Sequence, residues 1–132
     1  MMWDTHAHLN FSAFENDYHD IIAKCHKQSI SVILPASNLA TSRRAVEIAK
    51  EYETGVYAAV GMHPIHVYDE PCDIGEYKKL AQHPKVVAIG EVGLDYFHKE
   101  NGKSDEERKT KQYEALKQFL ALARELKLPL IL

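Results

Sequence analysis

The sequence predicts an α/β fold built on a parallel sheet. Short β-branched segments alternate with amphipathic segments that are long enough to form helices. The polar residues suited to chemistry stand at the ends of the short segments, and parallel strands bring such ends to one edge of a sheet. With 45% hydrophobic and 27% charged residues, the 132 residues have the composition of one globular domain, so we expect a single domain over 1–132.

The first half of the chain is expected to contain three strands and two helices. The first strand runs through His8, and the helix after it has apolar residues at helical spacing, which are Phe14, Tyr18, Ile21, Ile22 and Cys25. Residues 29–34 form a second strand that ends before Pro35. The second helix takes Asn38 or Thr41 as its cap and Gly55 as its terminator, and a third strand follows at 56–60.

Two capping boxes open the remaining helices. Asp73 and Glu76 begin a short helix, which precedes a fourth strand at 85–90. Ser104 and Glu107 begin the longest helix, after a polar loop over 95–103. The apolar stripe expected to face the sheet from this helix is Tyr113, Leu116, Phe119, Leu120 and Ala123. Residues 128–132 are expected to form a fifth strand.

Charge and hydropathy exclude two classes of protein. The net charge of −3 argues against a broad basic groove that holds nucleic acid by counterion release. No apolar run approaches the roughly 20 residues that a membrane span needs. The first candidate site residue is Asp4, which leaves no room for a signal peptide, so we expect a cytoplasmic location and no membrane partner.

Asp4, His6 and His8 alternate at the start of the chain. On a β-strand these side chains share one face, with the imidazoles about 7 Å apart. Buried parallel strands rarely carry three such polar groups without partners. The pattern therefore predicts a divalent metal site with His6 and His8 as ligands and Asp4 supporting them.

Further candidate residues follow the third and fourth strands. Glu91 comes directly after the fourth strand, where a buried carboxylate would be costly without a cation. His63 comes just after the third strand and could act in catalysis, although a His-Pro pair is also ordinary turn chemistry. Asp95 could support the site or cap the loop that follows it.

Three motifs resemble those of the TatD family of metal-dependent hydrolases in order and spacing. They are Asp4-Thr5-His6-Ala7-His8, Gly61-Met62-His63-Pro64 and Gly90-Glu91-Val92-Gly93-Leu94-Asp95-Tyr96. The resemblance covers the whole chain and implies a TIM-barrel fold. A complete (β/α)8 barrel takes about 250 residues, so the chain would be its amino-terminal half. The resemblance also implies a divalent-metal deoxyribonuclease that acts on DNA ends.

The resemblance implies a role for each candidate residue. His6 and His8 bind one metal ion, Glu91 is catalytic and bridges it to a second, and His63 lies near the scissile phosphate. Zn, Mn, Mg, Fe and Co are not distinguished by this set, so one or two divalent ions are expected without an identity. The family's later ligands, two histidines and an aspartate, have no counterpart in these 132 residues.

Two other functions stay open at this point. Amidohydrolases that cleave amides or esters share the His-x-His barrel start. The chain could instead be an inactive half-barrel, because five strands cannot close a barrel that needs eight. In that case we expect it to pair with another copy or with a separate carboxyl-terminal half. Under the nuclease interpretation the substrate is DNA, single-stranded or at an end.

Overall fold

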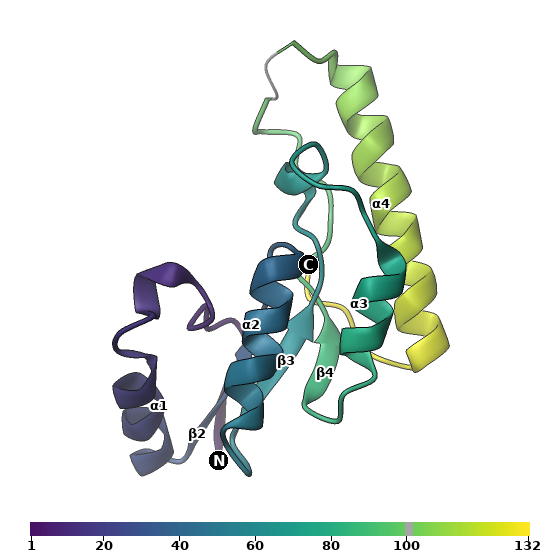
Figure 1. Cartoon of the computed structure of the whole chain (residues 1–132). Coiled ribbons are helices and arrows are strands. Elements are labelled where there is room, and N and C mark those ends of the chain that lie inside the picture. The colour runs from purple at the N-terminus through teal and green to yellow at the C-terminus, as the bar shows by residue number, and fades with distance from the viewer. Residues whose placement is uncertain (100–101) are drawn as a thin grey trace.

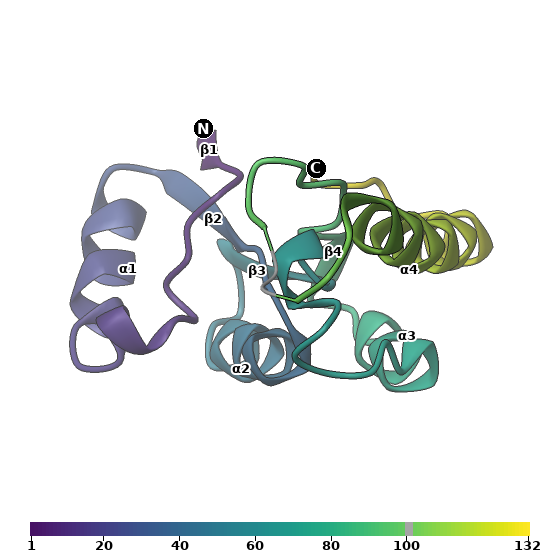
Figure 2. The same ribbon diagram turned by 90° about the horizontal axis from the view of Figure 1, so that it is seen from above.

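Four parallel strands form one curved sheet in the order β1-β2-β3-β4 (Figures 1 and 2). The computed structural model of the chain describes residues 1–99 and 102–132. The strands are β1 (Met2–Asp4), β2 (Ile30–Leu34), β3 (Val56–Val60) and β4 (Val86–Ile89). This confirms the α/β class. The expected polar loop over 95–103 includes two residues that lie outside the described ranges.

A helix follows each strand, and the helices lie along the outer side of the curved sheet (Figure 2). They are α1 (Tyr18–Lys27), α2 (Leu39–Lys50), α3 (Ile74–Ala81) and α4 (Asp105–Leu126), with 3-10 turns η1 (Ser12–Phe14) and η2 (Pro64–His66). Repeated strand–helix units on a curved parallel sheet make up half of a (β/α)8 barrel. None of the described helices combines the length and the apolar composition needed to cross a bilayer.

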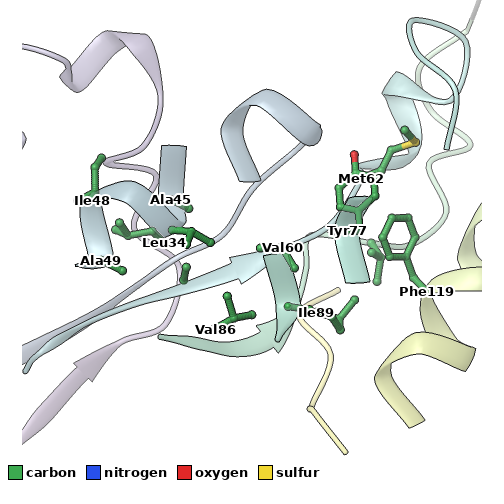
Figure 3. Close-up of a cluster of buried hydrophobic side chains, with 14 of the residues drawn as sticks. Leu34, Ala45, Ile48, Ala49, Val60, Met62, Tyr77, Val86, Ile89 and Phe119 are labelled. Atoms are coloured by element: carbon green, nitrogen blue, oxygen red, sulfur yellow. The ribbon is translucent and has the colours of Figure 1, made fainter. Parts of the chain in front are cut away.

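The core lies between the sheet and this outer layer of helices (Figure 3). Leu34 and Val60 are fully buried, and α2 contributes Ile48. Further along the sheet, the rings of Tyr77 on α3 and Phe119 on α4 meet edge to face at 5.0 Å between centroids. Burial of these apolar side chains holds the helices on one side of the sheet, which leaves the ends of the strands free to carry polar groups.

The helix caps largely follow the sequence. Asn38 and Thr41 form a reciprocal capping box on α2, and Ser104 forms one with Glu107 on α4. Asp73 accepts the backbone N–H of Glu76, but the Glu76 side chain turns to Arg43 and Lys79, so this box is only half formed. Gly55 has a left-handed φ of 80°, yet it is not the terminator of α2, which ends at Lys50.

The first and fifth expected strands are much shorter than predicted, whereas β2 and β4 differ from the prediction by one residue at one or both ends. β1 ends at Asp4 because its carboxylate accepts the backbone N–H of His6 and turns the chain, so His6 and His8 do not lie on a strand. The expected fifth strand is reduced to one parallel bridge between Leu130 and Ile89.

The inner face of α4 was predicted only in part: Phe119 and Ala123 lie in the core and Leu116 packs against it. Tyr113 is 54% exposed, whereas Arg108 and Gln112 are buried and share the inner face with Ala115 and Phe119. Their spacing is helical, but the two polar residues hid the stripe from a search for apolar residues. Both can be buried because their polar groups are paired with a loop that is described below.

Candidate metal centre

His6, His8 and Glu91 converge at the carboxyl ends of the strands. Their ligand atoms all lie within 4.8 Å of one another, although the histidines follow β1 and Glu91 follows β4. Nε2 of His6 lies 3.3 Å from Oε1 of Glu91, and Nε2 of His8 lies 3.2 Å from Oε2. Each carboxylate oxygen therefore faces one imidazole.

Backbone hydrogen bonds to the end of β2 bring these residues together. The N–H of Ala7 donates to the carbonyl of Ile33 at 3.0 Å, which holds the histidine segment against β2. The N–H of Glu91 donates to the carbonyl of Ala36, just beyond β2, at 2.6 Å. The segment that carries the histidines and the segment that carries Glu91 are therefore both hydrogen-bonded to the backbone at the end of β2, between Ile33 and Ala36.

Gly61 makes room for Glu91 at the end of β3. A Cβ atom at this position would lie 2.8 Å from the carbonyl carbon of Gly90 and 2.9 Å from the backbone oxygen of Glu91. Ordinary Cβ contacts are never this short, so only glycine permits the approach. The Oγ of Ser42 accepts the N–H of Gly61, which fixes this stretch from α2.

The orientation of His8 fits a metal ligand. Its Nδ1 lies 3.2 Å from the carbonyl oxygen of Pro35. A carbonyl can only accept, so Nδ1 carries the hydrogen, and the neutral ring then has Nε2 available to bind a cation beside Glu91. Metal-binding histidines are commonly fixed in this way by a backbone carbonyl. The His6 ring stands edge-on to the His8 ring, with 4.8 Å between centroids.

The distances from Glu91 to the two histidines match those around a shared ion. Nitrogen and oxygen ligands about 2.1 Å from one ion and 90–110° apart lie about 3.0–3.4 Å from each other. The observed separations of 3.2 and 3.3 Å fall within this interval. The side chain of Glu91 is only 17% exposed, so a cation there would also offset the cost of burying its charge.

His63 and Asp4 lie near this cluster without joining it. His63 lines a pocket of about 550 Å³ together with Glu91. Its Nδ1 accepts the N–H of Ile65 at 3.3 Å, and burial lowers its pKa, so the neutral ring has its hydrogen on Nε2. His63 can therefore donate to an anionic oxygen in the pocket. Asp4 is exposed and supports the backbone of His6 rather than its imidazole.

Comparison with known proteins identifies the family. The family model described as TatD related DNase matches residues 3–132. The chain belongs to the TatD family. It is 37% identical over 134 residues to the uncharacterized metal-dependent hydrolase YabD of Bacillus subtilis, and this match covers all of the chain and 50% of that protein.

Other TatD relatives agree with this assignment. The 3'-5' ssDNA/RNA exonuclease TatD of Erwinia amylovora is 30% identical over 133 residues, covering 99% of the chain and 49% of that protein. The crystal structure of the TatD homolog YjjV from Escherichia coli superimposes with a TM-score of 0.82 at 28% identity, covering 98% of the chain and 49% of that structure. The chain thus spans about half the length of the curated TatD relatives that it matches.

Asp95, in the third TatD motif, organises the loop after β4. Its carboxylate accepts the N–H groups of Phe97 and His98 at 2.9 Å and lies 2.7 Å from Nδ1 of His98. The hydrogen bond from the His98 backbone, followed by that from the His98 ring, lowers the pKa of Asp95. Asp95 therefore caps its own loop, which is one of the two roles that its position allowed.

Arg108 and Gln112 hold the same loop from α4, and sequence reasoning missed both. Arg108 is 3% exposed and donates from Nη1 to the carbonyls of Asp95 and His98. Gln112 donates to the carbonyl of Asp95 and accepts its N–H. The sequence feature that could have revealed them is their spacing: Arg108 and Gln112 are four residues apart and continue the helical spacing of the buried Phe119.

Replacing Asp95 with alanine is expected to loosen the tip of this loop. The substitution removes the acceptor of the Phe97 and His98 amides, so their hydrogen-exchange protection should fall about tenfold, the loss of one ordinary hydrogen bond. In the wild type, the lowered pKa of Asp95 means that this protection is fully present above the ordinary aspartate pKa and is lost as pH falls through the lowered pKa.

NMR-detected exchange measures this effect, with Asp95→Asn as the matched control. Asparagine keeps the acceptor oxygen but does not titrate, so protection at pH 7 should be largely retained and should not fall in acid. Unchanged protection at Phe97 and His98 in Asp95→Ala would show that Arg108 and Gln112 alone order the loop.

Proposed function

We propose that these residues form the amino-terminal part of a metal-dependent phosphodiesterase that cleaves DNA at single-stranded ends. The observation that carries the proposal is the convergence of His6, His8 and Glu91 at ligand distances. Support also comes from the Erwinia relatives, whose name describes a single-stranded DNA and RNA exonuclease. Because the chain spans half the length of its relatives, the activity is proposed for these residues within a closed barrel.

Each site residue has a distinct task in this proposal. A divalent cation supplies Lewis-acid activation of the phosphodiester and of water. His6 and His8 hold the cation through Nε2, and the Glu91 carboxylate supplies the negative charge that binds it. His63 donates its Nε2–H to a phosphate oxygen, since its Nδ1 is occupied by the Ile65 amide.

The 132 residues alone are expected to bind metal weakly and to lack appreciable hydrolysis. The TatD resemblance implies two further histidines and an aspartate as ligands, so His6, His8 and Glu91 are only part of the expected set. The inner side of the sheet also exposes Trp3, which stacks on Tyr57 at 5.5 Å between centroids. Under this proposal a carboxyl-terminal half, in the same or a separate polypeptide, covers that surface and supplies the remaining ligands.

A substrate panel tests the proposal. End-labelled single-stranded DNA, the matching RNA, a base-free phosphodiester and an amide are each incubated with the complete barrel and Mn²⁺ or Zn²⁺. We expect cleavage of the strand from its end, and loss of cleavage when a chelator removes the metal. Hydrolysis of the amide alone would overturn the nuclease proposal and assign the site to amidohydrolase chemistry.

A further inference from the structure

Exposed apolar side chains stand beside the candidate metal centre. Leu94, Tyr96 and Phe97 are all exposed, and Phe97 is 86% exposed. These three residues line the same pocket as Glu91 and His63. Single exposed apolar residues need no explanation, but a cluster at the mouth of a polar site indicates a ligand with an apolar face.

The loop that carries these rings is fixed before any ligand arrives. The buried side chains of Arg108 and Gln112, on α4, form hydrogen bonds with the backbone of Asp95. The Asp95 carboxylate in turn accepts hydrogen bonds from the amides of Phe97 and His98. A ring on a fixed loop loses little conformational freedom when it binds. This arrangement suits a contact surface better than a disordered tip.

Positive charge accompanies the aromatic rings. Nζ of Lys109 lies 4.9 Å from the centroid of the Tyr96 ring. Proteins that bind single strands combine aromatic rings, on which bases stack, with cations that attract the phosphates.

We propose that Tyr96 and Phe97 form a stacking platform for the unpaired bases of a single strand whose phosphate enters the metal centre. This inference rests on the proposed function and goes beyond it, because it assigns the contact that selects unpaired bases. Stacking uses the π-face common to all bases, so the platform tolerates any sequence. A base-paired end offers no free face beyond its last pair, which favours single strands.

Equilibrium binding without metal measures base stacking on Tyr96 and Phe97 separately from hydrolysis at the metal centre. The complete barrel in EDTA is titrated into a fluorescent dT oligonucleotide and into the same strand with abasic residues at its three terminal positions. We expect the dT strand to bind about tenfold more tightly, and Phe97→Ala or Tyr96→Ala to remove most of that difference, as one stacked base is worth. Phe97→Trp should retain it.

Tyr113→Ala is the matched control, because Tyr113 is an exposed aromatic residue on α4 that does not line the pocket. It should leave both affinities unchanged. Equal weakening of the dT and abasic strands by Phe97→Ala, or no change in either, would overturn the platform. Since no metal is present, this result is independent of whether the barrel hydrolyses DNA, and the substrate panel judges that question separately.

Discussion

Replacing Glu91 with glutamine in the complete barrel is expected to lower kcat on single-stranded DNA by more than about a hundredfold. Loss of an outer partner of a metal ligand already costs 10–100-fold, and Glu91 faces both imidazoles directly. Glutamine keeps the size of the side chain but removes the charge that attracts the cation. The metal-free protein should therefore unfold at nearly the same temperature, or slightly higher, because a buried charge is gone.

Titration calorimetry with Mn²⁺ or Zn²⁺ and a nuclease assay measure the two effects together. Glu47→Gln is the matched control, since Glu47 is exposed on α2, where it pairs with Arg44 away from the site. It should leave metal affinity and kcat unchanged. Hydrolysis close to the wild-type rate in Glu91→Gln would remove Glu91 from the metal site.

Replacing Gly61 with alanine should damage the same centre although Gly61 is no ligand. The added Cβ would lie 2.8–2.9 Å from the backbone of Gly90 and Glu91, so the end of β4 must move. Such overpacking costs about 1–3 kcal/mol of stability. A displacement of the Glu91 backbone by about 1 Å is enough to lower the rate about a hundredfold.

Gly75→Ala provides the matched control. Gly75 lies in the first turn of α3, where an added Cβ would meet only Oδ1 of Asp73 at 3.3 Å. Because alanine favours helices over glycine, stability should stay the same or rise by up to about 1 kcal/mol. Chemical denaturation and the nuclease assay distinguish the two variants. A Gly61→Ala protein with wild-type kcat would show that β4 can shift without moving its carboxylate.

The alternation of strands and helices could be predicted from the sequence because it depends on local patterns. Runs such as Ile30–Leu34 and caps such as Asn38 with Thr41 are encoded within a few residues. The length of β1 could not be predicted in this way. The Asp4 carboxylate competes with the strand for the His6 amide, and periodicity does not reveal which partner prevails.

Three of the candidate site residues could be assigned to one site before the structure. Parallel strands place their carboxyl ends at one edge, and the resemblance to the TatD family implied that His6, His8 and Glu91 bind metal there. The hydrogen bonds from Arg108 and Gln112 to the loop after β4 could not be predicted, because they are made to the carbonyl groups of Asp95 and His98. Backbone carbonyls leave no mark in a sequence, and a buried arginine resembles an exposed one until its acceptors are known.

The contact between segments that follow the first and last strands of the sheet has a mechanical consequence. A cation held by His6, His8 and Glu91 would cross-link the segments that follow β1 and β4, the two outer strands of the sheet. At a hundred times its dissociation constant, such a ligand adds about 2.7 kcal/mol to the free energy of unfolding. This stabilisation would apply to β1, whose residues are all exposed. Bound metal would therefore lower the rate at which the amino-terminal strand unfolds locally and is cleaved by a protease.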